Sequence, residues 1–196
     1  SAATIKQQLG YRAKKVIENL YPALSSLTLH DYEKMFLQLY KQQSHHINLI
    51  GGNNQGHSTL KKLRQHNYRI AIASNKRKEL LEYEIDNTET ADYIDHIVFV
   101  DDHTGKPEPD MLNTISQVTN IPAKECLMVG DHANDIIAAQ RAGMDSAAVL
   151  SGSYTRKDFA KLTQTATIVR SDILKLAESL PTATAAAPQK LSLIHI

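Results

Sequence analysis

The sequence contains little of what would set the protein apart from ordinary globular domains. It has no tryptophan and one cysteine, Cys126, so no disulfide can form within the chain. No apolar run reaches the roughly 18 residues of a membrane-spanning helix, and the first residues do not follow a signal-peptide pattern. A formal net charge of +1 gives no global reason to expect a nucleic acid or an anionic membrane as partner. These absences predict a cytoplasmic protein that binds neither a nucleic acid nor a membrane. Cys126 lies in a segment expected to be a buried strand, so we expect it to be a core residue.

The composition is that of a folded chain with a real core. Hydrophobic residues make up 42% and charged residues 22% of 196 residues, which are ordinary globular values. Residues 5–20 and 30–43 space their apolar side chains by three and four, the pattern of amphipathic helices. The segment GGNNQG, residues 51–56, is rich in turn formers and is predicted to be a hinge or linker.

After residue 52 the pattern changes to alternating strands and helices. Helices are expected at 57–66, 76–86, 108–118 and 134–142, and strands at 69–75, 96–102, 126–131 and 146–151. This alternation predicts an α/β fold with a mostly parallel sheet and right-handed crossovers. Residues 181–196 lose periodicity and are predicted to be disordered or to lie outside the domain.

The most informative segment is CLMVGDHANDIIAAQRAG, residues 126–143. An apolar run suited to a buried parallel strand ends in Gly130 and Asp131, and Asp135 follows at the start of a helix that Gly143 is expected to stop. Two carboxylates close together repel unless a proton or a cation intervenes, and an oxygen-only set suits Mg²⁺. The alternative is an aspartate turn followed by an aspartate helix cap.

Polar residues also follow two other predicted strands, and the sheet could bring them close to Asp131 and Asp135. Ser74 and Asn75 follow one strand, and Lys106 stands before two prolines in GKPEPD after the next. A hydroxyl, then a lysine before prolines, then GDxxxD is an order that resembles the haloacid dehalogenase-like hydrolase superfamily. The likeness is to its phosphoglycolate phosphatase-like branch with a helical cap, over about residues 5–180.

This resemblance implies a role for each matching residue. Ser74 would bind the transferring phosphoryl oxygens, with Asn75 extending the set of donors, and Lys106 would offset charge on the phosphate. Asp131 would be the direct or water-mediated Mg²⁺ ligand, and Asp135 would contact the metal's water or orient Lys106. For Ser74 and Lys106 the alternatives are a polar strand terminus and a solvated surface lysine. The implied substrate is a small phosphorylated metabolite, and the implied cofactor is Mg²⁺.

The resemblance also divides the chain into regions. Residues 1–52 would form a partial helical cap, residues 53–180 a Rossmann-like α/β core, and residues 181–196 a tail outside the domain.

The chain departs from the family at its first motif. The family places an aspartate nucleophile and a second aspartate in DxDx(T/V) at the end of its first core strand, and no DxD occurs in this sequence. The first core strand is therefore expected to be missing, with two strand edges left unpaired. Because the chain starts at Ser1 rather than Met, we expect an N-terminally truncated protein that is inactive alone, whose full-length form would use an aspartyl-phosphate.

Other classes fit the motifs less well. Neither GxGxxG nor GxxxxGK[ST] follows a strand, which disfavours a nucleotide-binding module. A receiver domain would need its acidic pair earlier and its lysine later than this sequence has them. A non-catalytic module that binds a phosphometabolite or a protein stays open, as do the exact substrate and the oligomeric state.

Overall fold

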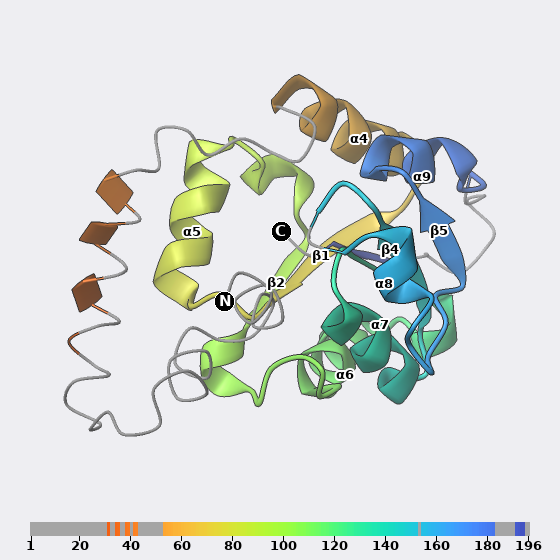
Figure 1. The fold of residues 1–196 in the computed structure, drawn as a ribbon. Helices are drawn as coiled ribbons and strands as arrows, with labels where there is room; N and C mark the ends of the chain where they lie inside the picture. Colours follow the sequence, from red (N-terminus) through yellow and green to blue (C-terminus); the bar gives the residue numbers. More distant parts are fainter. Residues whose placement is uncertain are drawn as a thin grey trace.

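The computed structural model describes residues 53–152, 154–182 and 191–194, together with residues 31, 34, 35, 38, 39, 41 and 42. Its centre is one six-stranded parallel sheet in the order β2-β1-β6-β3-β4-β5 (Figure 1). The strands are β1 Arg69–Ser74, β2 His96–Phe99, β3 Cys126–Gly130, β4 Asp145–Val149, β5 Ile168–Arg170 and β6 Leu191–Ile194. The predicted α/β fold with a Rossmann-like parallel sheet is confirmed.

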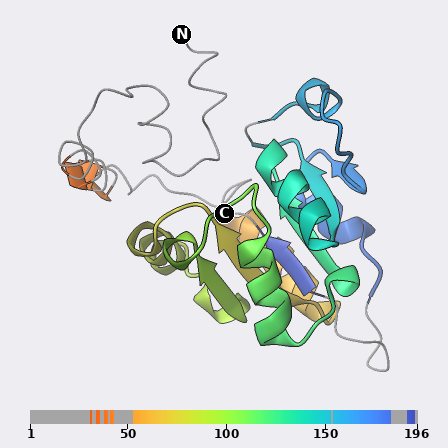
Figure 2. The ribbon, with the colours of Figure 1, turned by 90° about the horizontal axis from the view of Figure 1, so that it is seen from below.

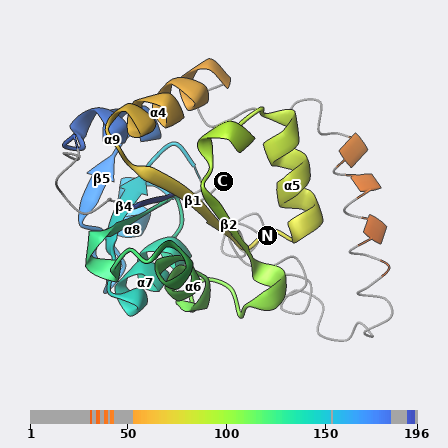
Figure 3. The same cartoon turned by 180° about the vertical axis from the view of Figure 1, so that it is seen from behind.

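Helices cover both faces of this sheet (Figure 2). On one face α4 and α9 lie side by side, and on the other α6 packs beside α7 (Figures 1 and 3). The helices are α4 Asn53–Gln65, α5 Lys78–Asn87, α6 Asp110–Thr119, α7 Ala133–Ala142, α8 Arg156–Phe159 and α9 Ile173–Ser179, with 3-10 turns at Ala91–Tyr93, Val100–Asp102 and Ala123–Glu125. Within the described ranges, no helix is long and apolar enough to cross a membrane.

Strand β1 illustrates why the sheet is buried on both faces. Ile70 joins Leu63 in the core under α4 and α9, whereas Ala71 joins Met111 in the core under α6 and α7. Alternate residues of a strand point to opposite faces, so a continuous apolar run fills both cores. Cys126 is also buried, and burial raises the pKa of its thiol to about 11, as suits a core residue.

Most predicted elements after residue 68 are found within two residues of their expected bounds. Helix α7 ends where expected, with Gly143 as its C-cap at a φ of 70°, a left-handed conformation that glycine adopts without strain. Four elements near the end of the chain, α8, β5, α9 and β6, were not predicted, because they are short and their apolar patterns are weak.

The predicted hinge at residues 51–56 is wrong from Asn53 onward, because α4 begins there. Asparagine is favoured at helix starts, and the buried Leu60 and Leu63 fix the helix against the sheet. Gly51 and Gly52 lie outside the described residues. So does most of the predicted cap, although the described residues between 31 and 42 are helical, as expected for 30–43. The domain boundary at residue 52 stays a prediction.

The end of the chain differs most from expectation. Residues 181–196 were expected outside the domain, but Leu191–Ile194 form β6, which pairs in parallel with β1 on one side and β3 on the other. The expected gap in the sheet is therefore filled by this segment. The physical reason is that two adjacent strand edges leave rows of unpaired N–H and C=O groups, which a short extended segment can satisfy. Residues 183–190, 195 and 196 lie outside the described part of the chain.

Candidate functional site

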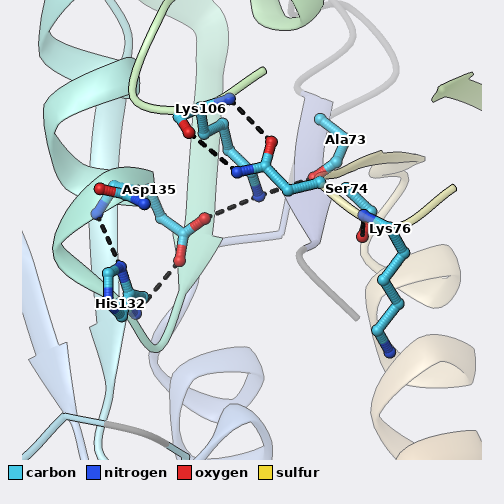
Figure 4. A network of polar contacts seen from close by, with 8 residues as sticks. Ala73, Ser74, Lys76, Lys106, His132 and Asp135 are labelled. Atoms are coloured by element: carbon cyan, nitrogen blue, oxygen red, sulfur yellow. Dashed lines mark hydrogen bonds and ion pairs between the residues drawn. The ribbon is translucent and has the colours of Figure 1, made fainter. Parts of the chain in front are cut away.

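The polar residues singled out from the sequence gather at the carboxyl edge of the sheet. Ser74 is the last residue of β1 and is fully buried, and Asp131 directly follows β3. Parallel strands place their carboxyl ends at one edge, where ligands of open α/β sheets bind. The Ser74 hydroxyl oxygen accepts a hydrogen bond from the Lys76 backbone N–H at 3.2 Å. The Lys76 side chain is held by Glu84 and extends away from Asp135 (Figure 4).

Lys106 connects these two strand ends. It follows the turn after β2, its side chain is buried, and its ammonium donates to the Ala73 carbonyl and to Asp135 Oδ1, each at 2.7 Å (Figure 4). Burial lowers the pKa of Lys106, and the Asp135 carboxylate opposes that shift. The alternative of a solvated surface lysine is therefore wrong. A cation is held between the end of β1 and the start of α7.

Asn75 fixes the loop that carries this lysine. Its side-chain amide donates to the Lys106 carbonyl and its Oδ1 accepts from the Lys106 N–H, both at 2.8 Å. The amide is thus engaged with the loop backbone, in a buried position where such paired hydrogen bonds are strong determinants of conformation. The predicted contribution of Asn75 to phosphate binding stays a prediction, whereas its contact with the Lys106 loop is a feature that sequence reasoning missed.

Asp135 has both carboxylate oxygens engaged. Oδ1 accepts from Lys106, and Oδ2 accepts from the backbone N–H of His132 at 3.1 Å. Of the two roles considered for Asp135, this arrangement favours orienting Lys106. The role of Asp135 as a metal ligand stays a prediction.

His132, which the sequence suggested could be merely exposed where the family often has a small hydroxyl residue, is buried in the structure. It is buried as the N-cap of α7, with Nδ1 accepting from the Asn134 N–H at 3.1 Å, while Asp135 reaches back to its N–H. The sequence instead predicted Asn134 or Asp135 near the N-cap of this helix. The signal that could have found the cap is the three-residue spacing from His132 to an acidic residue, as in a capping box.

This cap gives a testable pH dependence. Burial lowers the pKa of His132, so the unfolded chain binds the proton more readily and stability falls as the pH drops below the ordinary histidine range near about 6.5. We expect His132→Asn, which keeps a capping side chain, to flatten the pH dependence of the free energy of unfolding by up to about 1.4 kcal/mol per pH unit below that point. Urea unfolding from pH 5 to 8 measures it; parallel curves for the two proteins would contradict the expectation.

Asp131 is the residue predicted to hold Mg²⁺. Its carboxylate is partly exposed at the strand end, and the described residues contain no group of three or more histidine, cysteine or acidic side chains that could hold a metal. Mg²⁺ commonly keeps several waters and takes one or two carboxylates plus phosphate oxygens. A single carboxylate from the protein fits that ion, and it does not fit a metal that needs a full protein ligand set. The role of Asp131 as a metal ligand stays a prediction.

Known proteins resemble this chain over most of its length. The family model described as haloacid dehalogenase-like hydrolase matches residues 1–149. The chain is 28% identical over 158 residues to the pyrophosphatase PpaX of Bacillus cereus (strain B4264), an alignment that covers 78% of this chain and 72% of that protein.

Solved structures share the fold. A hydrolase from Pseudomonas syringae aligns with a TM-score of 0.79 at 22% identity, over 91% of this chain and 82% of the other. A β-phosphoglucomutase from Clostridium difficile aligns with a TM-score of 0.71 at 16% identity, over 90% and 78% of the two chains. At such identities the likeness concerns the fold alone, and the reaction has to be argued from the site.

Proposed function

Since the chain belongs to the haloacid dehalogenase-like hydrolase family, we propose that its strand-end site binds the phosphoryl group of a small phosphorylated metabolite for Mg²⁺-dependent phosphatase chemistry. The observation that carries the proposal is the position of Lys106, whose buried ammonium lies between the end of β1 and the start of α7. A buried cation at the carboxyl ends of parallel strands is suited to an anionic ligand.

Each residue of this site would have its own role in binding the phosphoryl group or the metal ion. The Ser74 hydroxyl donates to a phosphoryl oxygen, and Lys106 offsets the negative charge of the phosphate, with Asp135 fixing its ammonium in place. Asp131 would hold Mg²⁺, which when bound neutralises charge on the phosphoryl oxygens. Positioning and charge compensation are the main needs of phosphoryl transfer, so a lysine fixed by buried partners supplies a large part of them.

The proposed route through an aspartyl-phosphate needs an aspartate nucleophile. The sequence contains no DxD, and β6, which pairs between β1 and β3, has no carboxylate in Leu191–Ile194. We therefore expect no turnover from this chain alone, and a longer form would have to supply the nucleophile. The same observation favours a second function, non-catalytic binding of a phosphometabolite. Pyrophosphate, named for the Bacillus relative, and phosphoglycolate are the substrates to test first.

Binding without turnover is the expected result for the purified chain. We expect calorimetry with pyrophosphate and Mg²⁺ to give saturable binding, and phosphate-release assays with pyrophosphate and phosphoglycolate to give no product. Ser74→Ala should weaken binding about 10- to 100-fold, because a hydrogen bond to a charged group contributes roughly 1.5–3 kcal/mol.

Ser146→Ala is the matched control for this experiment. Ser146 is a buried serine of β4, far from that strand's carboxyl end, so its replacement should leave the affinity unchanged. Mg²⁺-dependent phosphate release that Asp131→Asn abolishes would overturn the expected inactivity. Equal affinities for the wild type and Ser74→Ala would overturn the assignment of Ser74.

A further inference from the structure

The segment that follows β4 lies against Asp131, although more than twenty positions in the chain separate Asp131 from the residues that contact it. The Tyr154 N–H donates to the Asp131 carbonyl at 3.1 Å, and Gly152 approaches the Asp131 side chain. Strands β3 and β4 are neighbours in the sheet, so the turns at their carboxyl ends are brought together. The conformation of Asp131 is therefore set by two strand ends.

Gly152 approaches Asp131 more closely than any other residue type would permit. A Cβ built on Gly152 would lie 2.5 Å from both Cβ and Cγ of Asp131, and closer still to its Oδ2. Real Cβ atoms essentially never come within 3.0 Å of another heavy atom. The φ of Gly152 lies outside the left-handed region, so space, and not an unusual backbone conformation, requires glycine here.

The segment is also fastened on its other side. The Tyr154 ring packs on His132, with ring centroids 4.4 Å apart, and on Phe159 at 5.5 Å. Thr155 caps α8 through the Asp158 N–H, so the chain beyond Gly152 is tied to a helix. Because the segment is held in this way, a side chain added at Gly152 would push against the Asp131 Cβ and carboxylate together and would shift both.

We propose that Gly152 is a positioning residue for Asp131, whose carboxylate takes its metal-binding direction from contact with the Gly152 backbone. The inference rests on the proposed role of Asp131 in holding Mg²⁺. It adds that the turn after β4, outside every motif identified in the sequence, controls the affinity of this site for a divalent cation. Sites of this kind depend on placement within fractions of an ångström.

The test is titration of the purified chain with Mn²⁺, used as a probe for Mg²⁺ and followed by the electron paramagnetic resonance signal of the free ion. Gly152→Ala should weaken Mn²⁺ binding at least tenfold, and Asp131→Ala should weaken it at least as much. In the Asp131→Ala background, Gly152→Ala should cause no further loss. The control is Gly143→Ala, where the added methyl meets no atom within 4 Å and the positive φ costs stability only.

The outcomes separate this inference from the proposed function. Unchanged Mn²⁺ binding by Asp131→Ala would overturn both. Weakened binding by Asp131→Ala with wild-type binding by Gly152→Ala would overturn the role of Gly152 alone. If Gly152→Ala is too unstable to titrate, urea unfolding without metal decides. Its loss of stability should be smaller in an Asp131→Gly background, which removes the Asp131 Cβ together with the carboxylate, and an equal loss in both backgrounds would overturn the contact.

Discussion

Replacing Lys106 by methionine should lower the free energy of unfolding by about 3–5 kcal/mol, because it leaves the buried Asp135 carboxylate without its cation. Methionine has a similar length, so the loss reports the missing charge more than a cavity. Binding of pyrophosphate should be lost as well. Urea unfolding measures the first effect and calorimetry the second.

A double variant separates stability from binding. In Lys106→Met with Asp135→Asn, the buried charge is gone while an oxygen remains to accept from the His132 N–H, so most of the lost stability should return. Pyrophosphate binding should not return, since the cation is still absent. Lys124→Met, at an exposed position, is the control and should change stability by less than about 0.5 kcal/mol. A Lys106→Met protein as stable as the wild type would show that the buried ion pair does not hold the site together.

The second large effect should come from β6. Leu193 pairs with Ala71 of β1 and with Met128 of β3, so a proline at 193 would remove a backbone donor in the middle of the sheet. We expect Leu193→Pro to destabilise the protein by at least about 3 kcal/mol, a large share of the 5–15 kcal/mol that holds a typical domain folded. Thermal unfolding followed by circular dichroism measures this loss, and size-exclusion chromatography detects association through the freed edges.

Leu193→Val is the matched control, because it keeps the backbone donor and a β-branched residue suits a strand. Its unfolding temperature should stay near that of the wild type. If the proline and valine variants unfold at the same temperature, β6 does not contribute to the sheet in solution. The protein would then have an open position between β1 and β3.

Strong local patterns explain which elements could be predicted. The apolar run of β1 and the strand–turn–helix of residues 126–143 were found because burial on two faces and a glycine stop leave clear signals. Strand β6 could not be predicted, since four residues carry no periodicity and their pairing depends on two edges far away in the chain. The start of α4 was missed because its glycine and asparagines read as a turn.

The residues of the candidate site also fall into those that local patterns predicted and those that they did not. Ser74, Lys106, Asp131 and Asp135 could be chosen because each follows a strand or opens a helix in a recognisable order. The residues that hold them in place could not be chosen from the sequence. Asn75 forms hydrogen bonds with the backbone of Lys106, 31 positions away, and the contact between Gly152 and Asp131 joins the ends of two strands. Such contacts arise from the order of strands in the sheet, which no local pattern encodes.

By itself, the sequence determined the α/β class, the family and the identity of the polar residues at the strand ends, because propensity, periodicity and motif order are local properties of the chain. Only the tertiary structure decided that Lys106 is buried against Asp135 and that His132 caps the helix beside them. It alone placed β6 in the centre of the sheet and Gly152 against Asp131. These arrangements depend on which distant backbone and side-chain groups satisfy one another once water is excluded from the core.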